Sequence, residues 1–149
     1  THLPQVFLGM AFAWSVPMAF AAQTGSVPAS SWYLYGIALL WPVIYDTFYA
    51  MVDRRDDERI HIKSTAILFG RHDRLMTGLL QGVFLGLLLV LGFYYQLSMV
   101  YYFALMIAGG LCIYQQWLIK ERLPAACFKA FLNNHWVGLV VFVGIALGV

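Results

Sequence analysis

The sequence predicts an all-α integral membrane protein, a helical bundle of about five transmembrane helices. Of its 149 residues, 62% are hydrophobic and only 11% are charged, and the mean hydropathy is +0.75. A soluble domain carries roughly 25% charged residues, so a water-facing surface is hard to build from this composition, whereas a lipid-facing surface needs no charge. The apolar residues also form runs of the length that crosses a bilayer, about 20 residues each.

Five segments are candidate membrane spans. We expect them at residues 6–22, from residue 32 into the region 46–53, and at residues 75–97, 100–119 and 131–149. In lipid only helices and closed barrels satisfy their backbone hydrogen bonds, and long runs without strict alternation favour helices. Pro17 and Pro42 lie inside the first and second segments, where each is expected to kink its helix.

The charges of the connections predict the topology. Residues 23–31 and the turn at 96–98 carry no charge, whereas residues 54–74 and 120–129 are rich in Lys and Arg. The positive-inside rule therefore places the second and fourth connections in the cytoplasm. The net charge of +2 is too small to favour nucleic acid as a partner. The cysteines, Cys112 and Cys127, have no disulfide or metal spacing.

The two ends predict a piece of a longer protein. The first residue is Thr1, and an apolar run starts at Val6 with no basic region before it, which is unlike a signal peptide. The sequence also stops at Val149, inside an apolar run. We therefore expect residues 1–149 to be a single membrane unit that is truncated at both ends.

One short segment holds most of the charge. Twelve of the sixteen charged residues fall between residues 46 and 74. Because a helix turns by about 100° per residue, Asp46, Tyr49, Asp53 and Asp57 share one face, with Asp56 at its edge. Like charges four residues apart weaken a helix, and an acid inside a span costs about 2.5–3.5 kcal/mol. The face therefore predicts a functional site.

A divalent cation would offset both costs. Mg²⁺ prefers oxygen ligands and is usually bound by one or two carboxylates plus substrate phosphates, so Asp53 and Asp57 are the candidate metal ligands, with Asp46 as the third catalytic acid. Nearby cations are candidates for the other phosphate oxygens: Arg59, Lys63, Arg71 and Arg74. The alternative is a solvated loop with surface ion pairs, above all for Arg54, Arg55, Asp56 and Glu58.

At these residues the chain resembles a known family. The segment YDTFYAMVDRRDDERIHIKSTAILFG, residues 45–70, is similar to the second aspartate-rich motif and the following loop of the UbiA-type intramembrane prenyltransferases. Two further stretches are similar as well: THLPQVFLGMAFAWSVPMAFAA at residues 1–22 and ACFKAFLNNHWVGLVVF at residues 126–142. The resemblance covers essentially the whole chain and implies the C-terminal half of a bundle of about nine helices.

The resemblance implies an activity and its substrates. It is closest to the members that transfer a polyprenyl group from polyprenyl diphosphate to 4-hydroxybenzoate, for ubiquinone biosynthesis, in the bacterial inner membrane. The family's metal-binding acids fall on Asp53 and Asp57, and Lys63 and Ser64 match the loop that closes over the diphosphate. Tyr49 and Asp46 lie just upstream, and Arg59 and Arg71 are further candidates for substrate binding.

The chain departs from the family in one respect. The first aspartate-rich motif, of the type N-D-x-x-D-x-x-x-D, is absent from residues 1–149, and so is the basic residue that the family places just upstream of Thr1 to hold the acceptor's carboxylate. We therefore expect this piece alone to be inactive.

The implied reaction is an electrophilic aromatic substitution, in which an allylic cation is attacked by the ring carbon ortho to the phenol. Trp14, Tyr45, Phe48 and Tyr49 are candidates to stabilise that cation, although ordinary helix packing explains them too. The polar run 133–135 is expected to cap the fifth helix. Four glycines are expected to allow close helix approach: Gly9, Gly86, Gly109 and Gly110.

Three other classes remain as alternatives. A CDP-alcohol phosphotransferase also has an aspartate-rich helix, but its D-G and A-R elements are missing here. A membrane cation transporter is expected to carry charges inside more than one span, whereas here only the second has an acid at depth. A non-catalytic scaffold leaves the acidic face unexplained.

Overall fold

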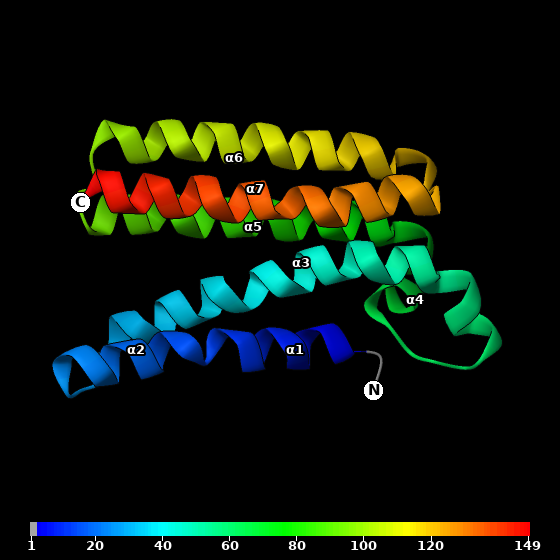
Figure 1. Ribbon diagram of the computed structural model, residues 1–149, viewed down its shortest axis with the longest axis horizontal. Helices are drawn as coiled ribbons and strands as arrows, with labels where there is room; N and C mark the ends of the chain where they lie inside the picture. Colours follow the sequence, from blue (N-terminus) through cyan, green and yellow to red (C-terminus); the bar gives the residue numbers. More distant parts are fainter. Residues whose placement is uncertain (1–2) are drawn as a thin grey trace.

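The computed structural model describes residues 3–149, which form helices and contain no strand (Figure 1). The long helices are α1 Pro4–Ala13, α2 Ser15–Thr24, α3 Ala29–Arg59, α5 Asp73–Tyr94, α6 Met99–Leu118 and α7 Pro124–Gly148. The short elements are α4 Thr65–Phe69 and the 3₁₀ turns η1 Gly70–His72 and η2 Ile119–Glu121. Five helical segments are long and apolar enough to cross a membrane, with α1 and α2 together forming the first. The predicted fold class is confirmed.

The two prolines act differently. Pro17 has no N–H to donate to the carbonyl four residues earlier, and the first span is broken at Trp14, between α1 and α2. Pro42 lies inside α3, which continues as one helix of 31 residues. The uninterrupted run of α3 to Arg59 fixes the spacing of the acidic residues that it carries.

The start of α7 differs from the prediction. The helix begins at Pro124, seven residues before the expected start at Phe131, because proline is favoured in the first turn of a helix. Asn133, Asn134 and His135 therefore lie inside α7, and the prediction that they cap it is wrong.

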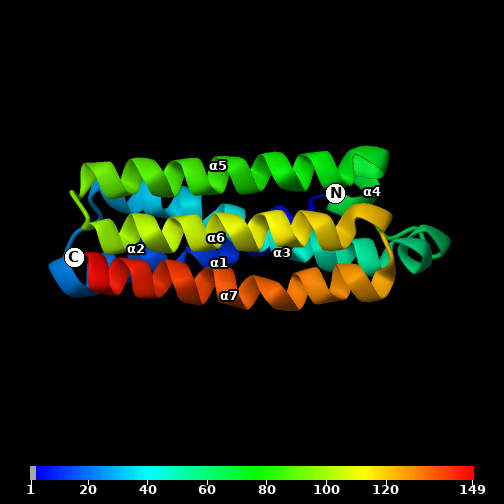
Figure 2. The same cartoon turned by 90° about the horizontal axis from the view of Figure 1, so that it is seen from above.

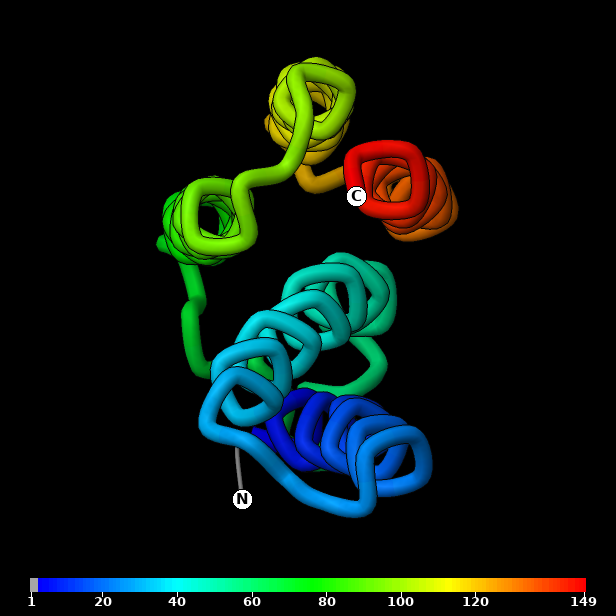
Figure 3. The backbone as a smooth tube through the Cα atoms, turned by 90° about the vertical axis from the view of Figure 1, so that its left-hand side faces the viewer, coloured from blue at the N-terminus to red at the C-terminus, as the bar shows by residue number. Residues whose placement is uncertain are grey.

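The helices form two groups around α3. α1 and α2 pack on one side of α3, and α5 and α7 pack on another, with α6 held between α5 and α7 (Figures 1 and 3). The connection through α4 and the α6–α7 turn lie at the same end of the bundle, while the α5–α6 turn and the C-terminus lie at the other (Figure 2). The two basic connections therefore share one end, as the alternation of charged and uncharged connections predicts.

The apolar residues divide between a core and an outer surface. Phe48, Tyr101 and Ile44 are buried, and they join α3 to the other long helices. Large apolar side chains are also exposed, such as Met99 at 80% and Ile113 at 73%. Such an extensive exposed apolar surface is expected where a protein faces lipid.

Only one of the four glycines predicted to allow close helix approach lies at such a contact. A Cβ on Gly9 would lie 2.6 Å from the Leu39 carbonyl oxygen of α3, so that prediction is confirmed. A Cβ on Gly86 or Gly110 would meet no atom within 4 Å, and one on Gly109 would make only ordinary contact, so these three predictions are wrong. The tight contact between α6 and α7 lies at Gly144, where a Cβ would approach the Ala104 Cβ to 2.5 Å.

This contact predicts a destabilising substitution. Gly144→Ala is expected to lower the free energy of unfolding by about 1–3 kcal/mol, because the added methyl overlaps Ala104 and forces α6 and α7 apart. Thermal and denaturant unfolding in detergent measure the change. Gly110→Ala is the matched control, since its methyl meets nothing and alanine favours a helix. Equal stability of the two variants would contradict the packing argument.

Candidate active site

The predicted acidic face is present on α3. Because α3 is regular through Arg59, Asp46, Tyr49, Asp53 and Asp57 follow one another on one side at helical spacing. The three carboxylates are half-buried, and Tyr49 is 41% exposed. The face runs from inside the span to the end of the helix that adjoins the basic connection (Figure 1).

Asp46 has a polar partner that the sequence did not reveal. The Gln5 side chain of α1 lies beside the Asp46 carboxylate, and the Gln5 Oε1 accepts a hydrogen bond from the Thr65 backbone N–H at 3.0 Å. Gln5 is only 7% exposed, so its amide ties α1, α3 and α4 together. This amide explains how the Asp46 carboxylate is accommodated inside a membrane span. In the sequence, the only local sign of the Gln5 contact is an isolated polar residue in an apolar run.

Asp53 and Asp57 supply carboxylate oxygens, the kind of ligand that Mg²⁺ prefers. In the described part of the chain neither carboxylate takes part in an ion pair. Residues 3–149 also contain no cluster of three or more His, Cys, Asp or Glu side chains arranged to hold a metal. Two carboxylates alone leave most of an octahedral shell to water and phosphate oxygens, which is how proteins usually bind Mg²⁺ with phosphate substrates.

The predicted phosphate-binding residues lie at the same end but do not converge. Lys63 and Arg71 are exposed on the connection between α3 and α5, and Arg74 is exposed in the first turn of α5. Arg59 forms an ion pair with Asp56 at 3.4 Å, and both side chains are 78% exposed, so this pair contributes little to stability. These exposed cations therefore lie at the end of the bundle where α3 ends, without a contact to Asp53 or Asp57 in the described residues.

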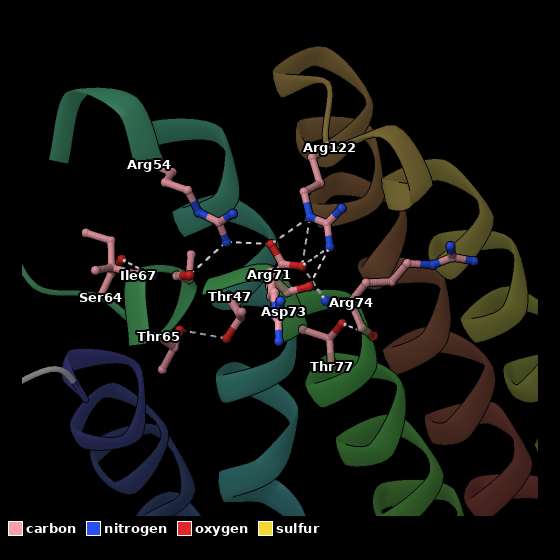
Figure 4. A network of polar contacts seen from close by, with 11 residues as sticks. Thr47, Arg54, Ser64, Thr65, Ile67, Arg71, Asp73, Arg74, Thr77 and Arg122 are labelled. Atoms are coloured by element: carbon pink, nitrogen blue, oxygen red, sulfur yellow. Dashed lines mark hydrogen bonds and ion pairs between the residues drawn. The ribbon is translucent and has the colours of Figure 1, made fainter. Parts of the chain in front are cut away.

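Ser64 has a local structural role. It is buried, and its Oγ caps α4 by accepting a hydrogen bond from the Ile67 N–H at 3.4 Å (Figure 4). The hydroxyl proton is still available to donate, because a capping oxygen acts only as an acceptor.

The sequence did not reveal the most buried group of ion pairs in the described residues. Asp73, the first residue of α5, is fully buried and accepts hydrogen bonds from Arg54 of α3 and from Arg122, whose Nε lies 2.9 Å and 3.1 Å from the two carboxylate oxygens (Figure 4). Arg54 also donates to the Ala66 carbonyl at 2.7 Å. The interpretation of Arg54 as part of a solvated loop is therefore wrong. The Asp73 carboxylate raises the pKa of Arg122.

The four predicted aromatic residues do not form one lining. Phe48 is fully buried in the core, and Trp14 packs edge-on against Trp32, with ring centroids 6.0 Å apart. Tyr45 and Tyr49, in contrast, both pack against Phe131 of α7, at 5.9 Å and 5.2 Å. Only these two tyrosines adjoin the acidic face.

Comparison with known sequences decides the family. The model of the UbiA prenyltransferase family matches residues 1–146. The chain belongs to the UbiA prenyltransferase family. The resemblance seen at residues 45–70 is thus confirmed over nearly the whole chain.

Curated members of the UbiA family are closely similar. The chain is 58% identical over 147 residues to a protein of Coxiella burnetii, and 56% identical over 145 residues to one of Vibrio parahaemolyticus; both are named 4-hydroxybenzoate octaprenyltransferase. The matches cover 99% and 97% of this chain but 51% of each relative. The chain therefore spans about half the length of these UbiA proteins. No solved structure matches it.

Proposed function

We propose that this chain is the C-terminal half of a membrane prenyltransferase that transfers a polyprenyl group from polyprenyl diphosphate to the ring of 4-hydroxybenzoate, in ubiquinone biosynthesis. The observation that carries the proposal is the half-buried pair of Asp53 and Asp57, unpaired in the described residues, on one face of α3 in a UbiA-family chain. The names of the relatives support this donor and this acceptor.

Asp53 and Asp57 would hold Mg²⁺, the cofactor of this proposal. When bound, the ion supplies positive charge that stabilises the departing diphosphate. Exposed cations of the neighbouring connection add to that charge by contacting phosphate oxygens, and we assign this role to Arg59, Lys63, Arg71 and Arg74. The Ser64 hydroxyl can donate to the same anion.

The remaining residues of the face position the substrate. Asp46 lies beside Gln5, and we assign its carboxylate a place beside the prenyl donor. The rings of Tyr45 and Tyr49 lie next to the acids and offer π-faces to a developing allylic cation. We also propose that the end bearing the acids faces the cytoplasm of a bacterium across its inner membrane, because the basic connections lie there.

A product assay tests this function. Membranes that contain the protein at its full natural length are supplied with 4-hydroxybenzoate and a polyprenyl diphosphate, and prenylated product is measured by mass spectrometry. We expect product with Mg²⁺ and none after chelation with EDTA. Residues 1–149 alone are expected to give none in either condition. Product that is unaffected by EDTA would refute the metal assignment, and ion flux without product would favour a transporter.

A further inference from the structure

A mostly apolar hollow of about 290 Å³ lies between α1, α3 and α7, partly open at the surface of the described chain. α3 packs against both of the other helices (Figure 3). Aromatic rings form most of the walls, from Phe12, Trp41, Tyr45 and Phe131, and Asn134 and His135 contribute polar groups. Trp41 and Tyr45 precede Asp46 on α3, so along this helix the hollow lies beside the acidic face, farther from the end that carries Asp53 and Asp57.

Two hydrogen-bond donors among the lining residues have no partner. The Nδ2 of Asn134 and the Nε1 of Trp41 are buried and form no hydrogen bond within residues 3–149. Asn134 is only 3% exposed. Buried N–H groups are nearly always hydrogen-bonded, because a buried N–H group without an acceptor destabilises the folded state. Both residues line the same hollow, and this points to a ligand with an oxygen acceptor.

A network of amides fixes which way Asn134 points. Gln81 of α5 donates to the Gln115 Oε1 at 2.8 Å, and the Gln115 Nε2 of α6 donates in turn to the oxygens of Asn133 and Asn134, at 3.1 Å and 3.4 Å. The Oδ1 of Asn134 is therefore occupied on the side of α6. Its Nδ2 is the end of the amide that is left for the hollow.

His135 adds a hydrogen-bond acceptor to the two donors, Asn134 Nδ2 and Trp41 Nε1. Its Nδ1 contacts the Leu132 carbonyl oxygen, which accepts hydrogen bonds only, so the proton of the neutral ring sits on Nδ1. Nε2 then offers a lone pair. The residues that line the hollow in the described chain include no Asp, Glu, Lys or Arg, so it suits an uncharged group.

We propose that this hollow binds the phenol end of the aromatic acceptor, with Asn134 and Trp41 donating hydrogen bonds to the phenol oxygen and the His135 Nε2 accepting a hydrogen bond from the phenol O–H. A phenol on a flat ring matches both features, because its oxygen accepts and donates hydrogen bonds and its ring stacks on aromatic walls. The inference rests on the proposed function, for which it names the residues that recognise the acceptor.

Direct binding without a prenyl donor tests the proposal. The full-length protein in detergent is equilibrated with radiolabelled 4-hydroxybenzoate or benzoate, which lacks the phenol oxygen. We expect the wild type to bind 4-hydroxybenzoate about tenfold more tightly than benzoate. Asn134→Leu, which removes the amide at similar size, should abolish this preference, and Trp41→Phe should reduce it.

Asn133→Leu is the matched control, because Asn133 accepts from the same Gln115 but does not line the hollow. It should keep the preference. Equal binding of the two ligands by the wild type, an undiminished preference in Asn134→Leu, or equal loss in both asparagine variants would each overturn the proposal. If Asn134→Leu does not fold, Trp41→Phe decides alone by the same criterion.

The binding test is separable from the proposed function. A wild type that shows the phenol preference but forms no prenylated product would refute the function and leave this site standing. Product formation with an unchanged KM for 4-hydroxybenzoate in Asn134→Leu would refute this site and leave the function standing. In the supporting case the KM for 4-hydroxybenzoate rises and the KM for the prenyl donor does not.

Discussion

Asp53→Asn is expected to lower the kcat of prenyl transfer by about 10²–10³-fold, the typical loss when one group that stabilises developing charge is removed. The substitution keeps the size of the side chain and removes one of the two carboxylates that α3 presents at the predicted metal site. The full-length protein in membranes is assayed with saturating 4-hydroxybenzoate and polyprenyl diphosphate over a range of Mg²⁺ concentrations. We expect the Mg²⁺ concentration for half-maximal activity to rise as well.

Glu58→Gln is the control for this experiment. Glu58 is exposed, lies in the same last turns of α3, and points away from the face that carries Asp53. It loses the same charge at nearly the same distance from the end of the bundle. An equal loss of activity in both variants would mean that net charge alone causes the loss. Full activity of Asp53→Asn would mean that the acidic face is no more than a solvated helix end.

The acidic face was predictable because it depends only on local geometry. Helical spacing places Asp46, Asp53 and Asp57 together whatever surrounds them, provided that the helix is not interrupted, and α3 continues past Pro42 to Arg59. The five spans were predictable for a similar reason, since the thickness of the bilayer sets a length that hydropathy reveals. Their ends were less certain where a charge such as Lys129 interrupts an apolar run.

The contacts between helices were not predictable in the same way. Lipid and the bundle core accept the same apolar residues, so composition does not distinguish the face of α5 or α6 that meets another helix. Gly110 and Gly144 therefore look alike in the sequence, although only Gly144 touches the neighbouring helix. The hollow at Asn134 depends on three helices at once and leaves no local signal.

Asp73 shows the same limit for charged residues. In the sequence it stands among Arg71, His72 and Arg74, in a stretch that reads as a solvated loop. Its partners Arg54 and Arg122 lie 19 and 49 residues away, and only the folded chain brings them together. A weak local indication is its place just before a long apolar run, where an acid suits the first turn of a helix.

Asp73→Asn is expected to lower the free energy of unfolding by about 3–5 kcal/mol, the cost of removing one partner from a buried ion pair. The carboxylate is fully buried and joins Arg54 of α3 to Arg122 of the α6–α7 turn, so its loss leaves two guanidinium groups without a counter-charge. Unfolding in detergent, followed by circular dichroism over a denaturant series, measures the change.

Glu121→Gln provides the comparison, because its ion pair with Lys120 is 3.5 Å long and both side chains are well exposed. Its effect should stay within about 0.5 kcal/mol. Arg122→Gln should fall between the two, since Arg122 is 39% exposed and Arg54 remains paired with Asp73. Similar stabilities for Asp73→Asn and Glu121→Gln would contradict a buried pair. The graded order would instead show that one buried carboxylate holds both basic connections against the end of α3 that carries Asp53 and Asp57.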